Sequence, residues 1–188
     1  MKLALLALLG ATLMASRTEI VEGNPSSPVR VVIYEDLQCP DCQKLRALLD
    51  EKVLAKYGSR VAFVHRDFPM GKHDWARQAA IAGRWIGEQN PPLAIVFRRE
   101  LMSEQLHITS ATLEPWLREF AVRNHLNANG IIAALSDPRL DALVDQDYQS
   151  ALARGVNKAP TIIVGGQRFS EIILYDDIAR ALDIELGH

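Results

Sequence analysis

Cysteine is scarce in this sequence, which has only Cys39 and Cys42 among its 188 residues. Two cysteines cannot build a framework of several disulfides, and no third cysteine is present to form a separate structural bridge. The five histidines are scattered, and no two of them have the spacing of a paired zinc-ligand motif. A zinc site within one chain is therefore disfavoured, although a half-site shared between two copies stays open.

An excess of charge is also absent, because 21 lysines and arginines face 23 aspartates and glutamates, for a net charge of −2. The sequence has no basic cluster, so we expect no nucleic-acid partner. Internal repeats and low-complexity tracts are missing too. The composition is that of an ordinary globular protein, and the length suffices for one domain with a sizeable core, or for a domain with an insertion.

A long apolar run occurs only at the N-terminus, where Leu3 to Ala15 follow Met1 and Lys2. This run is too short to span a bilayer as a helix, and a basic residue ahead of it is typical of a secretory signal peptide. We therefore predict that residues 1–16 are a signal peptide and that the protein is periplasmic or otherwise exported. The alternative is a buried N-terminal helix.

The two cysteines form the motif Cys39-Pro40-Asp41-Cys42, directly after the apolar run Val31 to Tyr34. This pattern predicts a buried strand, a short turn and a helix that opens on C-x-x-C. Pro40 suits the first helical turn because it has no N–H to lose, and a helix N-terminus favours a thiolate. The motif therefore indicates a redox-active dithiol. The alternatives are a structural disulfide and a pair of inert buried cysteines. A disulfide between these two cysteines would close a very short loop and so would stabilise the fold little.

The rest of the chain surrounds this motif with a regular order of elements. Residues 18–22 suit a short edge strand, and residues 61–64 suit a strand that forms a parallel β-α-β unit with residues 29–34. The pattern is helical from 72 to about 154, and residues 160–169 read as a hairpin around Gly165 and Gly166. A last helix begins near Tyr175. The sequence therefore predicts an α/β protein.

Three segments of the chain resemble the thioredoxin superfamily, and more closely the DsbA-like thiol–disulfide oxidoreductases. They are residues 36–42, residues 66–69 with His73 and Ala76 after them, and residues 155–161. The resemblance covers roughly residues 18–185. It implies a thioredoxin-like fold with a helical domain inserted between its β-α-β and β-β-α halves. The first half would be residues 18–71, the insertion 72–154 and the second half 155–188.

The resemblance also implies roles for single residues. Cys39 would be the nucleophile and Cys42 the buried resolving thiol. Pro160 would be a cis-proline beside the disulfide, and the backbone of Ala159, Pro160 and Thr161 would pair with a substrate peptide. No cofactor and no metal are expected. The partners would be protein thiols and disulfides, with a membrane redox partner for recycling, and we expect a monomer.

We expect three residues to tune the redox potential of the dithiol, namely Pro40, Asp41 and Lys158. Some positions near the dithiol also depart from the family pattern. Asp41 stands where strongly oxidising members carry histidine, and its charge should raise the pKa of Cys39. Lys158 should act in the opposite direction if its ammonium lies near the thiols, and otherwise it is a solvated surface lysine.

The acidic residues and the histidine near the motif also compare with positions in the family. Ile33 stands where some relatives bury an acid, a role that Glu35 or Asp36 could take, although Asp36 could equally cap the turn before the helix. His73 matches a recurring position in the family, and a capping or packing role is expected for it.

These observations predict a thiol–disulfide oxidoreductase that acts on exported proteins, most plainly as an oxidase that donates disulfides. Because of Asp41, a reductase in the same compartment is the close alternative. A non-catalytic module that binds peptides at the Pro160 edge, or that shares zinc across a dimer, is the alternative from a different class.

Overall fold

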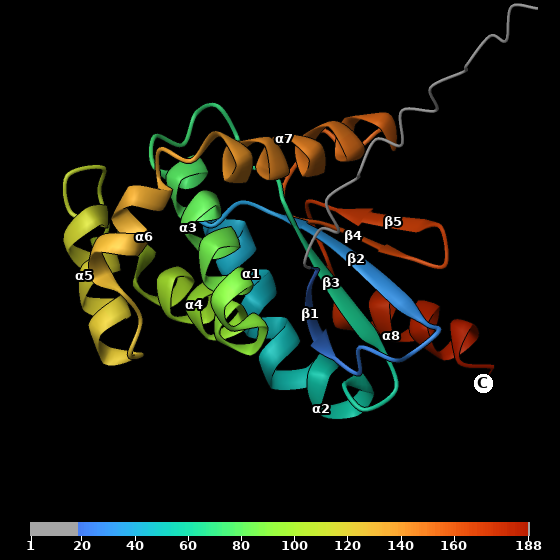
Figure 1. Cartoon of the computed structure of the whole chain (residues 1–188). Coiled ribbons are helices and arrows are strands. Elements are labelled where there is room, and N and C mark those ends of the chain that lie inside the picture. Colours follow the sequence, from blue (N-terminus) through green and yellow to red (C-terminus); the bar gives the residue numbers. More distant parts are fainter. Residues whose placement is uncertain (1–18, 188) are drawn as a thin grey trace, which may run out of the picture.

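The computed structural model describes residues 19–187, and the predicted signal peptide at residues 1–16 lies outside that range. In this described part of the chain, five strands and eight α-helices follow each other in the order β-β-α-β, helices, β-β-α. Within residues 19–187, no helix combines the length and apolar character that a membrane span requires. Figure 1 shows the sheet at one end of the molecule and a group of helices at the other.

The sheet has the order β1-β3-β2-β4-β5, with β2 at its centre. Its strands are Ile20–Gly23, Arg30–Glu35, Ala62–Asp67, Thr161–Val164 and Gln167–Ser170 for β1 to β5. Strands β2 and β3 are parallel, whereas β1 pairs with β3, and β4 with both β2 and β5, in antiparallel fashion. The central parallel pair is the β-α-β unit that the sequence predicts.

One long helix connects β2 to β3, and the remaining helices follow β3. The connecting helix comprises α1 (Pro40–Leu48), a π-helical turn (Leu49–Val53) and α2 (Leu54–Tyr57). The insertion contains α3 (Ala76–Gln89), α4 (Pro91–Glu104), α5 (Leu113–Arg123), α6 (Ala128–Ala134) and α7 (Pro138–Ala153). Helix α8 (Tyr175–Glu185) closes the chain. A helical insertion in a thioredoxin-like fold is thus confirmed, while the domain boundaries stay a prediction.

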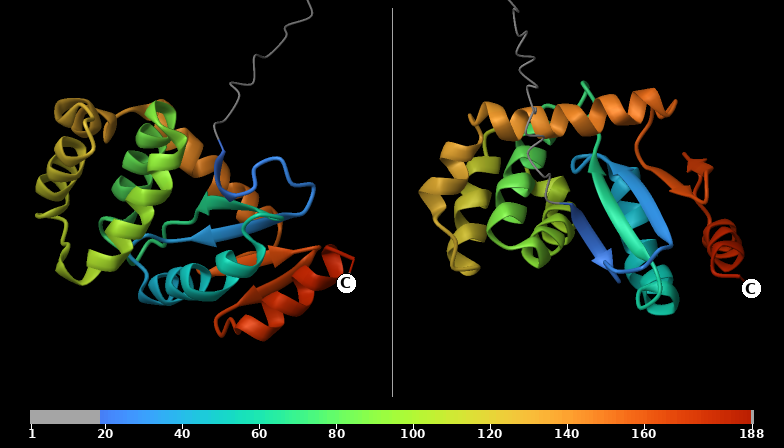
Figure 2. Two further views of the ribbon diagram at one scale, coloured as in Figure 1. Left: turned by 90° about the horizontal axis from the view of Figure 1, so that it is seen from below. Right: turned by 45° about the vertical axis from the view of Figure 1, so that its right-hand side comes forward.

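Helices cover both faces of the sheet. Helices α1, α2 and α8 pack on one face around an apolar cluster that includes Ile33, Phe63 and Leu182. Helix α7 crosses the other face, where Phe68 stacks on Tyr148 with ring centroids 4.7 Å apart. Figure 2 shows the sheet between these two layers. Because β2 is buried on both faces, its sequence is an almost unbroken apolar run up to Tyr34.

The local signals of the sequence correspond closely to the structure. Gly165 and Gly166 both have positive φ angles, of 52° and 85°, as a two-residue hairpin turn of type I′ requires. Asp137 accepts a hydrogen bond from the N–H of Arg139 and so caps α7, and Gly155 follows the helix with a φ of 70°. The edge strand β1 begins two residues later and ends one residue later than expected, at residues 20–23.

A chain of buried charged side chains joins the insertion to the sheet. Arg98 of α4 donates to Glu35 of β2 at 2.7 Å and also to Asp67 of β3. Arg84 of α3 donates to Asp67 at 2.5 Å and to Asp147 of α7. All five residues are at most 3% exposed. Because removing charges from water is costly, each of these groups depends on its partners remaining in place.

The same network continues towards the edge of the sheet through His65 of β3. Its ring nitrogens contact Glu35 at 2.8 Å and Glu22 at 3.3 Å, and Glu22 also accepts from Arg46 at 2.7 Å. Burial alone would raise the pKa of Glu35, but the charges of His65 and Arg98 outweigh it and lower the pKa. Burial would lower the pKa of His65, yet the neighbouring carboxylates raise it. Both shifts favour the charged forms of the two groups.

The buried network predicts that two arginine substitutions lower the free energy of unfolding by different amounts. Arg98→Met should lower the free energy of unfolding by about 3–5 kcal/mol, because Glu35 and Asp67 each lose a buried partner and the network is left one positive charge short. Urea unfolding followed by circular dichroism measures this loss.

The control is Arg123→Met in α5, where Arg123 is 48% exposed and pairs with the exposed Glu100. This surface pair should contribute less than about 1 kcal/mol. Equal small losses in the two variants would contradict the importance of the buried network.

Candidate active site

The two cysteines lie where the central strand β2 gives way to helix α1. Cys39 is the N-cap residue of α1, with extended backbone angles, and Pro40 is the first helical residue. Cys42 follows on the same first turn and is 1% exposed, whereas Cys39 is 4% exposed and borders a surface hollow. Both cysteines are therefore buried, but only Cys39 lines the wall of a hollow that opens to solvent.

Strand β4 brings Pro160 to the same place from the far end of the chain. Tyr34 of β2 pairs with Thr161 of β4, so the residues before Thr161 lie beside the turn that follows β2. The Cys39 thiol contacts the carbonyl oxygen of Ala159 at 3.6 Å. The Ala159–Pro160 bond is cis, as the resemblance implies. The sheet register thus joins residues that are 120 positions apart in the sequence.

The surroundings of Cys39 favour its thiolate. The pKa of Cys39 is lowered from 9.0 to about 6, chiefly because the Cys42 thiol donates a hydrogen bond to its sulfur. Burial acts against this shift, whereas the backbone N–H groups of Cys42 and Asp41 at the helix N-terminus support it. A substantial part of Cys39 is therefore ionised at neutral pH.

Cys42 has the opposite character. Burial raises its pKa well above the ordinary value, and its hydrogen bond to Cys39 and the charge of the Cys39 thiolate raise it further. The N–H of Asp36 donates to its sulfur at 3.4 Å. Cys42 therefore holds its proton more strongly than Cys39 does.

Asp36 organises this turn to an extent that the sequence does not reveal. Its carboxylate is buried and accepts from the N–H of Gln38 at 2.8 Å, from the N–H of Met70 at 2.7 Å and from Nδ1 of His73 at 2.8 Å. The first bond is the turn cap considered above. The other two tie the loop after β3 to the dithiol turn, and they give His73 a bonding role rather than only a packing role.

Two of the expected tuning residues have partners of their own. The Asp41 side chain is 61% exposed and pairs with Lys44 at 2.9 Å. The net pKa shift of Cys39 is downward, and the charge that opposes it most is that of Asp36. Lys158 borders the same hollow as Cys39, but its ammonium pairs with Glu171. Each of these two charges thus has a partner of opposite sign, and the influence of Asp41 and Lys158 on the redox potential stays a prediction.

Strand β2 carries a buried acid near Cys42, two residues beyond the position where some relatives have one. Ile33 is fully buried in the apolar cluster under α1, and Glu35 lies on the same face of the strand. The charge of Glu35 contributes to the raised pKa of Cys42. Because Arg98 and His65 hold Glu35 ionised, its carboxylate is a poor acceptor for a proton.

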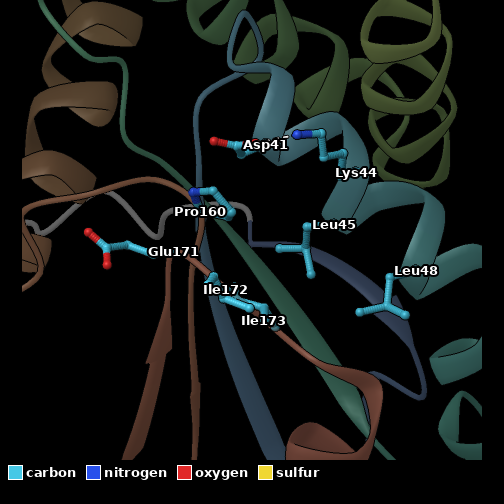
Figure 3. Close-up of a pocket in the computed structure, with 8 residues that line it drawn as sticks. All are labelled: Asp41, Lys44, Leu45, Leu48, Pro160, Glu171, Ile172 and Ile173. Atoms are coloured by element: carbon cyan, nitrogen blue, oxygen red, sulfur yellow. Dashed lines mark hydrogen bonds and ion pairs between the residues drawn. The ribbon is translucent and has the colours of Figure 1, made fainter.

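Two adjoining hollows lie beside Cys39 and share the residues Asp41, Pro160, Glu171 and Ile172. The one next to Cys39 has a volume of about 460 Å³ and includes Met70, Lys72, Lys158 and Ala159. The other, of about 370 Å³, is lined by Leu45, Leu48 and Ile173 with Lys44. Figure 3 shows Pro160 between the α1 side chains and the loop of Ile172 and Ile173. The hollows together form a cleft that leads away from Cys39.

The reactive groups at the cleft are the sulfur atoms of the two cysteines. Among residues 19–187, no three side chains of histidine, cysteine, aspartate or glutamate are grouped as a metal site. Thr161, which is 1% exposed, donates its hydroxyl to the carbonyl of Lys158 at 2.7 Å and so fixes the backbone around Pro160. The arrangement is suited to dithiol–disulfide exchange with an extended chain laid along Ala159 and Pro160.

Solved structures share this architecture over almost the whole chain. BdbD from Bacillus subtilis, in its oxidised form, superposes with a TM-score of 0.81 at 21% identity, covering 91% of this chain and 94% of that one. Alpha-DsbA1 from Wolbachia pipientis superposes with a TM-score of 0.76 at 15% identity, covering 90% and 91% of the two chains. Likeness at this level of identity establishes the fold.

Curated relatives by sequence include Na⁺/H⁺ antiporters. The chain is 32% identical over 149 residues to NhaA 3 of Salinispora tropica and 28% identical over 149 residues to NhaA of Herminiimonas arsenicoxydans. Each match covers 79% of this chain but only 22% of the antiporter. The family described as Thioredoxin matches residues 15–184, which include the C-x-x-C helix start and the cis-proline strand. On this match and this fold, the chain belongs to the thioredoxin family.

Proposed function

We propose that the protein is a thiol–disulfide oxidoreductase that exchanges disulfides with exported proteins through Cys39 and Cys42, and that it acts as a disulfide donor. The observation that carries the proposal is the pairing of Cys39, which lines a surface hollow and has a lowered pKa, with Cys42, which is buried away from the hollow and has a raised pKa. A thiol of low pKa is a good leaving group, which favours release of a disulfide to substrate. The match to antiporters covers about a fifth of their length, so ion transport is not part of the proposal.

In the proposed reaction a substrate thiolate attacks Cys39 of the Cys39–Cys42 disulfide. The sulfur–sulfur bond between the cysteines breaks, Cys42 leaves and takes up a proton, and a mixed disulfide forms between substrate and Cys39. A second substrate thiolate then attacks the substrate sulfur of that bond, and Cys39 leaves as a thiolate. The substrate loses two electrons and the cysteine pair gains them. Attack by Cys42 instead would restore the starting disulfide.

The cleft supplies binding for such a substrate. An extended segment beside Ala159 and Pro160 would have its cysteine at Cys39, and neighbouring side chains would enter the hollow of Leu45, Leu48 and Ile173. Pro160 has no N–H, so the strand start remains open for a partner backbone. A membrane redox partner would reoxidise the pair after each cycle.

Cys39 should react as a thiolate at unusually low pH. Alkylation of the reduced protein by iodoacetamide should follow a single titration with a midpoint near pH 6, where an ordinary thiol titrates near 9. The folded pKa is depressed, so the thiolate stabilises the reduced protein fully above pH 9 and loses this effect as the pH falls through about 6.

Cys42→Ser provides the matched control, because it changes the group that contributes most to the shift. Its alkylation midpoint should move upward from that of the unchanged protein. A midpoint near 9 in the unchanged protein would contradict the assignment of Cys39 as the nucleophile.

Replacing each cysteine in turn should affect the reaction with a peptide in a different way. Cys39→Ser should reduce oxidation of a reduced peptide dithiol to the uncatalysed rate, because the variant cannot form the Cys39–Cys42 disulfide that the substrate thiolate attacks. Cys42→Ser, incubated instead with the disulfide form of the peptide, should accumulate a mixed disulfide that is visible as an added mass, because the Cys39 thiolate opens the peptide disulfide and no Cys42 thiol is present to release the peptide. Full oxidase activity in Cys39→Ser would disprove the mechanism.

The equilibrium redox potential decides the direction of electron flow. We expect a value near about −120 mV, typical of disulfide donors, and a value near about −270 mV would favour a reductase. Asp41→His should raise the potential by about 30 mV, a tenfold change in the equilibrium constant, because it removes a negative charge beside Cys39. Asp145→His on α7 is the control, and an equal response of both variants would remove the role of Asp41.

A further inference from the structure

The charges that border the cleft are not balanced. Asp41 pairs with Lys44, and Lys158 pairs with Glu171, so these four charges offset one another. Lys72 borders the hollow next to Cys39, is exposed, and has no ion-pair partner among residues 19–187. The wall of the cleft therefore carries one uncompensated positive charge close to the reactive sulfur.

The position of Lys72 is held by bonds on both sides of it in the chain. The N–H of Met70 and the ring of His73 both bind the buried carboxylate of Asp36, and the N–H of His73 donates to the carbonyl of Met70 at 2.9 Å. This turn is thus attached to the dithiol turn itself. The backbone of Lys72 is therefore held in place beside the hollow, while its side chain remains free to contact a ligand.

The buried carboxylate to which the turn of Lys72 is bonded is not available to neutralise Lys72. The Asp36 carboxylate is buried and already accepts three hydrogen bonds. An incoming group with a negative charge would therefore find an unpaired cation in the hollow beside Cys39, while a positively charged group would be repelled.

We propose that Lys72 makes the cleft select protein substrates that carry an acidic side chain next to the reacting cysteine. This rests on the proposed function and adds the substrate class: the carboxylate lies against Lys72 on one side of Cys39, and an apolar side chain occupies the hollow of Leu45 and Leu48 on the other. The selection is electrostatic, so it acts on the rate of encounter and weakens with salt.

Two small disulfide reagents test the charge of the cleft without requiring a physiological substrate. The reduced protein reacts with the dianionic dithiobis(nitrobenzoate) and with the neutral dithiodipyridine, and the ratio of the two rates reports the field at Cys39. Lys72→Gln should lower the anionic-to-neutral ratio about threefold at low salt, and Lys72→Glu should lower it further. The differences should vanish near about 1 M salt, where the Debye length is about 3 Å.

Lys56→Gln is the matched control, because Lys56 lies on α2 outside both hollows and is 47% exposed. This variant loses the same charge and should leave the ratio unchanged. A ratio that is equal in the unchanged protein and in Lys72→Gln, or that falls as much in Lys56→Gln, would overturn the proposal.

Peptides then test the substrate class. Two dithiol peptides that differ only by glutamate or glutamine beside the first cysteine are oxidised by each variant. The glutamate-to-glutamine rate ratio should be about threefold higher in the unchanged protein than in Lys72→Gln, and dividing the ratios cancels the intrinsic reactivity of the peptides. Equal ratios would overturn the substrate class. If no peptide were oxidised while the reagent ratio still depended on Lys72, the proposed function would be wrong. The effect of Lys72 on the electrostatic potential at Cys39 would still be supported.

Discussion

The buried ion pairs between the insertion and the sheet are the constraint on which the rest of this structure depends. Arg84 and Arg98 extend from α3 and α4 to carboxylates on β2, β3 and α7. Apolar packing tolerates small shifts, but a buried charge without its partner is costly, so these pairs require one relative placement of insertion and sheet. The insertion is consequently part of the same cooperative unit as the half-folds on either side of it.

This constraint extends to the chemistry because Glu35 and Asp36 are neighbours in sequence. Glu35 ends β2 and belongs to the ion network, whereas Asp36 begins the dithiol turn and binds the loop of Met70 and His73. The charge of Glu35 helps to keep Cys42 protonated, while that of Asp36 limits how far the pKa of Cys39 falls. The two acids thus connect the packing of the insertion to the division of roles between the cysteines.

Local chemistry in the sequence predicted much of the site. A C-x-x-C motif at a helix start, a β-branched strand before it and a Gly-Gly hairpin each depend on residues close together in the chain. Arg98 could not be assigned in this way, because it binds Glu35 across 63 positions and looks like an ordinary charge on an amphipathic helix. The partners of Asp41 and Lys158 were equally hidden. Ion pairing is decided by tertiary position, whereas helix and turn signals are not.

Helix α7 sets the spacing between the two halves of the site. Its start is fixed by the Asp137 cap, its middle by Asp147 and Tyr148 against the sheet, and its end by Gly155, shortly before Pro160. Its 16 residues span about 24 Å, and one added residue would turn everything beyond it by about 100°. An added residue in the connections between α3 and α6 would leave Gly155 and Pro160 where they are, whereas an added residue in α7 would move both of them relative to Cys39.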